Sequence, residues 1–252
     1  ISLVAIASLL GGIPVAAQQK CTPEQLGVAR TVEIDTTGGP GFGFEQYKAH
    51  DFLSLKDVVL TFDDGPQKIH TEAVLAALAA QCTKATFFSI GKMALGYPEI
   101  LREIAKQGHT IGTHTWSHAD LRKKKTGAEA TEEIEKGISA VGRAVGAPVA
   151  PFFRFPFLAD SKETLAYLGS RNIAVFSQDV DSFDFKFGNK PEQLVQSVMG
   201  KLDKKGKGII LMHDIQPGTA KALPMLLAEL KAKGYRVVHM KAKGELKSLA
   251  QF

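Results

Sequence analysis

Apolar and β-branched runs of strand length alternate along the chain with stretches that have the apolar spacing of about 3.6 residues typical of amphipathic helices. The runs stay apolar at successive positions, as expected for parallel strands that are covered on both faces. This alternation predicts a parallel α/β fold, and both a closed or nearly closed barrel and an open doubly wound sheet satisfy it. The predicted strands cover residues 57–62, 84–90, 109–113, 150–155, 173–177, 208–213 and 235–240.

The N-terminal part of the chain lies outside this alternation. Residues 1–17 carry no charge and end in small side chains, which is typical of the apolar core and cleavage site of a secretory signal. A membrane anchor is the alternative, but glycine and proline interrupt the run, so we expect no stable membrane span. The protein is then exported, to the periplasm, the cell surface or the medium. We expect a signal remnant over 1–19, an N-terminal arm over 20–55 with a strand at "RTVEI", and the main domain over 56–252.

Export gives the two cysteines a role. Cys21 follows the expected cleavage point, and Cys82 ends a helical stretch. An oxidising compartment favours a disulfide, which would tie the arm to the main domain. Spacing alone also allows two free thiols. We expect a bridge between Cys21 and Cys82.

The composition narrows the classes of partner. The chain has 252 residues, of which 44% are hydrophobic and 23% charged, as in globular proteins. The formal net charge of +5 comes from scattered lysines without an interleaved aromatic stripe, so we expect no nucleic-acid partner. No glycine-rich phosphate-binding motif follows a predicted strand, which disfavours nucleotide binding. We expect a monomer.

Ionisable residues follow several predicted strands at their C-terminal ends. In parallel α/β folds the ligand site lies at that edge of the sheet. Scattered surface residues would not collect there systematically, so these side chains are the candidates for a functional site. They are Asp63 and Asp64, His114 and His118, Arg154, Asp179, Asp181 and Asp184, and His213 with Asp214.

The adjacent carboxylates Asp63 and Asp64 need an explanation, because like charges at the end of a buried strand repel each other. A solvated Asp-Asp-Gly-Pro turn is one interpretation. The other involves His114 and His118, which are four residues apart and close enough to share a metal ion. With one carboxylate they form a site of two histidines and one carboxylate. The cation offsets the charge of the second carboxylate, which stays free to act as a base on water.

The remaining polar residues suggest the rest of an acid–base site. His213 stands at a strand end, where an imidazolium can protonate a leaving group, although a hydrogen-bonded core histidine is the alternative. Arg154 can hold the free aspartate ionised and oriented. Asp181 can pair with His213 and raise the pKa of its imidazole.

Five short motifs resemble those of the polysaccharide deacetylase family, carbohydrate esterase family 4. They are "TFDDGP", "HTWSH", "RFP", "DSFDF" and "LMHD", in this order, within residues 55 to 240. The resemblance implies a deformed (β/α) barrel of about seven parallel strands. It also implies metal-dependent hydrolysis that removes acetyl groups from N-acetylated glycans, such as chitin-like polymers or peptidoglycan.

The resemblance also implies a role for each motif residue. Asp63 corresponds to the catalytic base and His213 to the catalytic acid. Arg154 corresponds to the residue that orients the base, and Asp181 to the one that tunes the acid, although "DVDSFD" leaves that match open by one or two residues. The backbone N–H of Phe157 corresponds to the oxyanion donor. The metal ligands are Asp64, His114 and His118, and the ion is usually Zn²⁺, sometimes Co²⁺ or another divalent cation.

Two positions depart from the family's motifs. Phe157 stands where the family usually has tyrosine, and Phe185 stands where it usually has tryptophan. We expect these changes to affect which substrate the protein accepts more than whether it is active. The alternatives are an esterase for O-acetyl xylan, an amidase for a non-sugar substrate and a non-catalytic glycan-binding protein. Two histidines and a carboxylate also occur in non-haem iron oxygenases, which the α/β alternation and the second aspartate disfavour.

Overall fold

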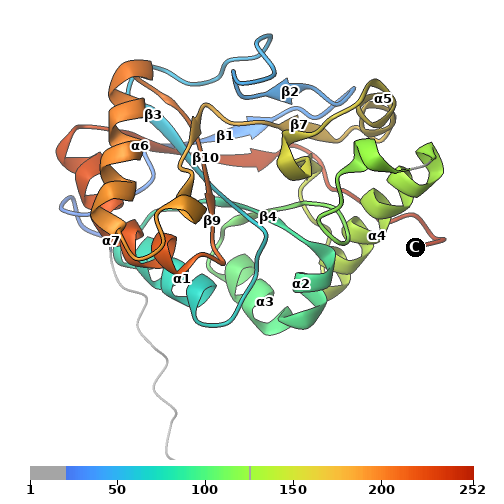
Figure 1. Ribbon diagram of the computed structural model, residues 1–252, viewed down its shortest axis with the longest axis horizontal. Coiled ribbons are helices and arrows are strands. Elements are labelled where there is room, and N and C mark those ends of the chain that lie inside the picture. Colours follow the sequence, from blue (N-terminus) through green and yellow to red (C-terminus); the bar gives the residue numbers. More distant parts are fainter. Residues whose placement is uncertain (1–20, 125) are drawn as a thin grey trace, which may run out of the picture.

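A curved sheet of parallel strands with helices packed around it forms the body of the molecule (Figure 1). The computed structural model describes residues 21–124 and 126–252. The strand order is β1-β10-β3-β4-β5-β6-β7-β2, while β9 pairs with β3 and β8 pairs with β9. Every pairing between these strands is parallel, which confirms the predicted parallel α/β barrel.

Each of the seven predicted apolar runs contains a strand. These strands are β3 (Asp57–Asp63), β4 (Thr86–Ser89), β5 (Thr110–Thr113), β6 (Phe152–Phe153), β7 (Ala174–Phe176), β9 (Gly208–His213) and β10 (Arg236–Ala242). The strand predicted at "RTVEI" is β1 (Arg30–Ile34). Two further strands of two residues each, β2 (Gly41–Phe42) and β8 (Val180–Asp181), are too short to give a periodic signal.

The helices begin and end at the residues that commonly cap them. Proline opens α3, α6 and α7, where its missing N–H costs no helical hydrogen bond. Gly146 ends α4 with a φ of 80°, a conformation that glycine adopts without strain. The helices are α1 (His70–Ala80), α2 (Gly91–Gly96), α3 (Pro98–Lys106), α4 (Gly127–Val145), α5 (Lys162–Ser170), α6 (Pro191–Lys205) and α7 (Pro217–Ala232), with 3₁₀ turns η1 (Leu121–Lys123), η2 (Pro156–Leu158) and η3 (Asp184–Lys186).

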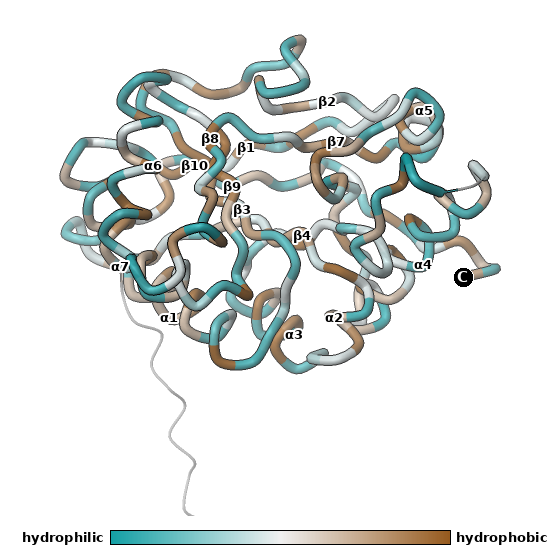
Figure 2. The backbone as a smooth tube through the Cα atoms, in the orientation of Figure 1, coloured by the Kyte–Doolittle hydropathy of each residue, from teal (hydrophilic) through white to brown (hydrophobic). Residues whose placement is uncertain are grey.

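Alternation along the central strand separates two apolar cores. In β3, Val58, Leu60 and Phe62 pack outward against the helices, and Val59 packs into the barrel interior. Figure 2 shows the hydrophobic segments concentrated in the central strands, with hydrophilic segments on the outer turns. Because side chains alternate along a strand, Asp63 lies on the same face as Val59. The strand therefore delivers this carboxylate to the inner side of the barrel at its C-terminal end.

The segment expected as an arm over residues 20–55 is built into the barrel. Strand β1 runs parallel to β10, and β2 runs parallel to β7. Ile34, Phe42 and Leu53 join the interior core. These apolar contacts hold the N-terminal segment against the same sheet that carries the candidate site residues.

A disulfide joins Cys21 to Cys82, at the end of α1, and confirms the expected pairing. The expected signal remnant over 1–19 lies outside the described residues. Among the described helices, none has the length and apolar character needed to cross a membrane.

Candidate metal centre and active site

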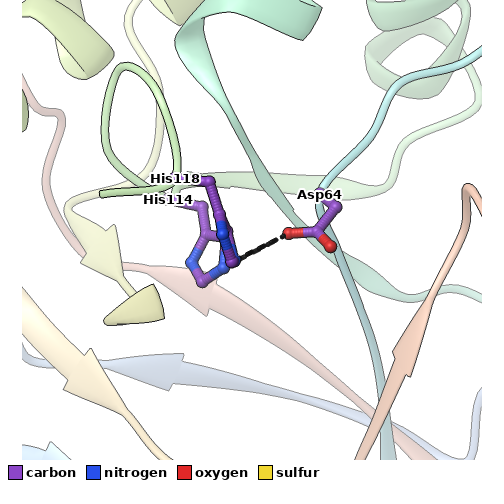
Figure 3. Close-up of side chains that lie close together, drawn as sticks. All are labelled: Asp64, His114 and His118. Atoms are coloured by element: carbon purple, nitrogen blue, oxygen red, sulfur yellow. Dashed lines mark ion pairs between the residues drawn. The ribbon is translucent and has the colours of Figure 1, made fainter. Parts of the chain in front are cut away.

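Three side chains from two loops converge at the C-terminal edge of the sheet (Figure 3). Asp64 follows β3, and His114 and His118 follow β5. One ligand atom of each lies within 4.8 Å of the others. Asp64 Oδ1 is 3.5 Å from His114 Nε2 and 3.3 Å from His118 Nε2. The structure thus brings together the three residues expected to ligate a metal.

The state of these atoms fits a bound cation. Asp64 Oδ1 is buried and has no hydrogen-bond partner among the described residues. His114 Nδ1 lies 2.7 Å from the Arg154 carbonyl, which can only accept, so the ring carries its proton on Nδ1 and its Nε2 lone pair is free. Burial and the neighbouring His114 lower the pKa of His118, which keeps its ring neutral and able to ligate. Two imidazole nitrogens and one carboxylate oxygen suit Zn²⁺ and related divalent ions.

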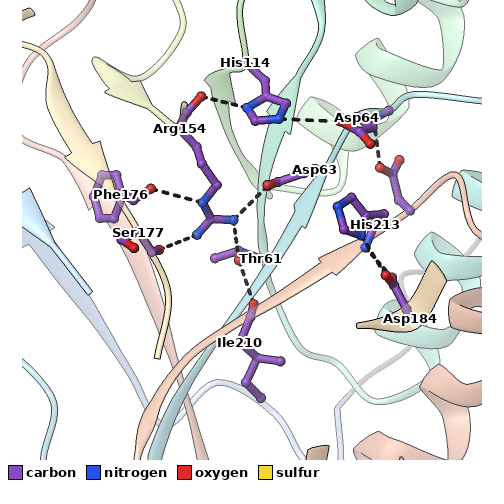
Figure 4. A network of polar contacts seen from close by, with 12 residues as sticks. Thr61, Asp63, Asp64, His114, Arg154, Phe176, Ser177, Asp184, Ile210 and His213 are labelled. Carbon is purple, nitrogen blue, oxygen red and sulfur yellow. Dashed lines mark hydrogen bonds and ion pairs between the residues drawn. The ribbon is translucent and has the colours of Figure 1, made fainter. Parts of the chain in front are cut away.

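Asp63 is held by a buried arginine (Figure 4). Arg154 Nη1 donates to Asp63 Oδ1 at 2.7 Å and to Thr61 Oγ1 at 2.8 Å. The same guanidinium donates to the carbonyls of Phe176 and Ser177 at the end of β7, the strand that pairs with β6. Both side chains are almost fully buried, so the guanidinium places a fixed opposite charge beside the Asp63 carboxylate and sets its orientation. The other oxygen, Asp63 Oδ2, has no hydrogen-bond partner among the described residues.

His213 ends β9 beside Asp63, its partner in the pairing of β3 with β9. Its Nδ1 lies 2.7 Å from Asp184 Oδ1, and its backbone N–H donates to Asp184 Oδ2 at 2.6 Å. Burial lowers the pKa of His213, but the hydrogen bond and charge of Asp184, with the charges of Asp63 and Asp64, outweigh it and raise the pKa to about 9. The imidazole is therefore protonated at neutral pH.

The partner of His213 is Asp184, and the expected pairing with Asp181 is wrong. Asp181 lies in β8, opposite Leu211, and accepts the N–H of Phe183 at 2.8 Å. The chain then turns through Phe183, whose φ is 50°, and this turn brings Asp184 back over the end of β9. The nearby acidic residues left the match open by one or two positions, and the turn that decides it gives no periodic signal.

Asp179 has a third, structural role. Its Oδ1 accepts the N–H of Phe44 at 2.8 Å, and its Oδ2 accepts the N–H of Ile209 at 2.6 Å. These bonds join the segment after β2 to β9, next to the strands β2 and β8, which do not pair with each other. Asp179 thus closes the barrel wall rather than contributing to the site.

These geometric features agree with the comparisons to known proteins. The family model for polysaccharide deacetylases matches residues 53–175. Peptidoglycan-N-acetylglucosamine deacetylase of Listeria monocytogenes is 32% identical over 186 residues, which cover 73% of this chain and 38% of the relative. Chitin deacetylase 1 of Saccharomyces cerevisiae is 35% identical over 168 residues, 65% of this chain and 54% of that protein. The structure of a Bdellovibrio bacteriovorus peptidoglycan deacetylase has a TM-score of 0.76 and 35% identity, and the match covers 85% of this chain and 59% of that one.

The chain belongs to the polysaccharide deacetylase family. It spans between 38% and 59% of the length of these three relatives. The matched region contains Asp64, His114 and His118, and the structural match covers 85% of this chain.

Two exposed aromatic rings stand at the mouth of this deacetylase-family site. Phe157 is 67% exposed, and its ring packs edge-to-face with that of His118 at a centroid distance of 4.6 Å. Phe185 is 53% exposed, and its ring centroid lies 6.1 Å from that of His213. Between them is a cavity of about 590 Å³ that Asp63, Asp64, Asp181 and Leu211 also line. The backbone N–H of Phe157 has no acceptor among the described residues and stays available to a ligand.

The buried Asp214, next to His213, holds the loop that carries Asp64, a role that the sequence did not predict. Asp214 Oδ1 accepts the N–H of Gly65 at 3.0 Å, and Oδ2 accepts the hydroxyl of Thr71 at 2.5 Å. A Cβ at Gly65 would come within 1.9 Å of Asp214, so only glycine fits there. Burial and the charge of Asp64 raise the pKa of Asp214 to about 7. Its position directly after His213 in "LMHD" was the only signal in the sequence.

Unusual backbone conformations gather around the site. Of the ten described non-glycine residues with positive φ, seven lie in the loops that surround it. Such conformations cost free energy and persist where the surroundings enforce them. The seven are Asp64, Ile69, Thr115, His118, Phe157, Leu158 and Phe183.

Proposed function

We propose that the protein is a metal-dependent hydrolase that removes acetyl groups from the N-acetylated sugars of a glycan and releases acetate. The observation that carries this proposal is the arrangement of one cavity. The cavity contains the Asp63 carboxylate held by Arg154, a set of three candidate metal ligands, and the His213 imidazole that Asp184 keeps protonated. Amide hydrolysis needs a base for water and an acid for the leaving amine. Asp63 is placed to act as the base, and the protonated His213 as the acid.

Asp64, His114 and His118 would hold a divalent ion, Zn²⁺ or another such as Co²⁺. When bound, such an ion acts as a Lewis acid and makes water a stronger acid at neutral pH. The charges of the side chains favour a bound cation. Among the described residues, only one guanidinium, that of Arg154, lies within salt-bridge distance of the two adjacent aspartates Asp63 and Asp64.

The side chains of the protein supply the proton transfers. Asp63 accepts a proton from the attacking water, and Arg154 keeps its carboxylate in place throughout. The Phe157 N–H donates to the oxygen of the acetyl group as negative charge develops there. His213 gives a proton to the departing amine, so water and amide become acetate and a sugar amine. Asp184 holds the imidazole through Nδ1, which leaves Nε2 to face the leaving group.

Export to the periplasm, cell surface or medium is part of the proposal. The Cys21–Cys82 disulfide supports it, because such bonds persist in oxidising compartments. The uncharged residues 1–17 support it as well. An N-acetylated glycan of the cell envelope or of a chitin-like polymer would be within reach there.

The test is acetate release from a panel of chitooligosaccharides, peptidoglycan and acetylated xylan, each with and without a chelator. We expect release from an N-acetylated substrate, loss of that release with chelator, and recovery when Zn²⁺ or Co²⁺ is added back. Release from xylan alone would indicate an O-acetyl esterase. An absence of release from every substrate after metal is restored would contradict the proposal.

A further inference from the structure

Because Asp184 is the partner of His213, Asp181 has no role in proton transfer, although it lines the cavity. Its Oδ1 accepts the Phe183 N–H, whereas its Oδ2 has no hydrogen-bond partner among the described residues. Within residues 21–124 and 126–252, no lysine, arginine or histidine nitrogen lies within salt-bridge distance of this carboxylate. Asp63 and Asp64, the other two carboxylates of the cavity wall, both have such a neighbour.

The strand register places Asp181 on the wall that carries His213. Asp181 pairs with Leu211, two residues before His213 in β9. Because side chains alternate along a strand, Leu211 and His213 point to the same face, and both line the cavity. Asp181 therefore faces the cavity one layer below the imidazole. A sugar whose amine receives the proton of His213 lies against this wall.

The surroundings of Asp181 Oδ2 make it selective for ligands that donate a hydroxyl group. Of the other residues that line the cavity, Phe155, Phe185 and Leu211 offer no side-chain hydrogen bond. The amine of Lys201 donates to the main-chain carbonyl of Asp181 at 2.6 Å and lies 4.4 Å from the Phe183 ring centroid. Burial raises the pKa of Asp181, as expected for a partly desolvated carboxylate. A ligand that donates a hydroxyl to such an oxygen binds more tightly, and a ligand without a donor binds more weakly because the oxygen is left unpaired.

On the basis of the proposed function, we propose that Asp181 selects the sugar ring through the 3-oxygen, which is bound to the ring carbon next to the one that carries the acetamido group. A free 3-hydroxyl, as in N-acetylglucosamine, donates to Asp181 Oδ2. A ring whose 3-oxygen carries a carboxyalkyl ether, as in N-acetylmuramic acid, has no such donor and brings a second negative charge to the same wall. Like charges placed together at an interface disfavour binding, so the protein acts on N-acetylglucosamine residues and rejects muramic residues.

The substrate for the test is a peptidoglycan tetrasaccharide with alternating N-acetylglucosamine and N-acetylmuramic rings, and the deacetylated ring is located by mass spectrometry. Wild-type protein is expected to deacetylate the N-acetylglucosamine rings. Asp181→Asn removes the charge, and Asp181→Ala removes both the charge and the acceptor. We expect each variant to lower the preference for N-acetylglucosamine by roughly tenfold or more. The matched control is Asp203→Asn, an exposed carboxylate on α6 paired with Lys233.

A 3-deoxy analogue of an N-acetylglucosamine oligosaccharide isolates the hydroxyl contact. Wild-type protein should discriminate against it, and Asp181→Ala should lose that discrimination, while the alkaline limb of the pH profile stays in place. An unchanged ring preference in both Asp181 variants would overturn the inference. A shifted alkaline limb with unchanged ring preference would overturn it too, since Asp181 would then act through His213. Wild-type protein that releases no acetate from any ring would instead refute the proposed function.

Discussion

Three aspartates of one short segment have different tasks because their surroundings differ. Asp179 accepts two backbone N–H groups and joins two strands, Asp181 faces the cavity with a free oxygen, and Asp184 holds an imidazole. The residue type is the same in all three. What decides the role is the position of each carboxylate relative to the end of β9, which the turn at Phe183 sets.

The charge of His213 depends on Asp184, and this dependence can be measured. Replacing Asp184 with Asn removes the main influence that raises the pKa of His213, so the alkaline limb of kcat/KM should move down by about one unit or more from its wild-type position. The measurement is a pH–rate profile on an N-acetylated oligosaccharide. An unshifted limb would show that another group sets it.

The same pair should contribute to stability in a defined pH range. Because folding raises the pKa of His213 from its ordinary value of about 6.5 to about 9, its contribution is fully present below the unfolded pKa and is lost as pH rises through the folded one. Asp184→Asn should therefore lower the free energy of unfolding more near pH ~6 than near pH ~10. Chemical denaturation at both pH values checks this, and an equal loss at both would contradict it.

At the scale of elements, the sequence was informative where apolar patterns are long. The central strands β3, β9 and β10 are six or seven residues long, each has at least four consecutive buried residues, and each coincides with a predicted strand. Strands β2 and β8 contain two residues each, and tertiary contacts rather than propensity create them. The three candidate metal ligands follow strand ends, and their convergence could be predicted, whereas the roles of Asp184 and Asp214 depend on turns that bring distant residues together.

The loop that carries Asp63 and Asp64 is an element whose position depends on one glycine. In Gly65→Ala the added Cβ would lie 1.9 Å from Asp214 Oδ2, so the loop or the aspartate must move. We expect weaker metal binding by equilibrium dialysis and a lower free energy of unfolding. The matched control is Gly200, inside α6, where an added Cβ would meet no neighbouring atom within 4 Å. Gly200→Ala should leave metal binding unchanged and add about 0.5–1 kcal/mol of stability.

At the scale of the whole molecule, covalent and non-covalent contacts join the N-terminal segment to the barrel. Cys21 and Cys82 are 61 residues apart in sequence, and in the chain-entropy account a bridge of that span stabilises the folded state by about 4 kcal/mol. The double variant Cys21→Ser, Cys82→Ser should lose up to that amount in chemical denaturation. It should still release acetate when folded, because neither cysteine lines the site cavity. A folded variant without activity would contradict this separation.

The barrel also explains how residues from distant parts of the chain reach one cavity. Parallel strands end at a common edge, so β3, β5 and β9 each deliver their following residues to the same place. Arg154 then connects β3 to the carbonyls after β7 across the interior. Site geometry is therefore a property of the closed sheet rather than of any one motif.

The most direct test of the account compares wild-type protein with Asp63→Asn, both stripped of metal and reloaded with Zn²⁺. Asp63 is the expected base but not an expected ligand, so the two proteins should bind equal amounts of metal. The account predicts that wild-type protein releases acetate from an N-acetylated oligosaccharide and that the variant, at equal metal content, does not. Acetate release by Asp63→Asn at the wild-type rate would contradict it.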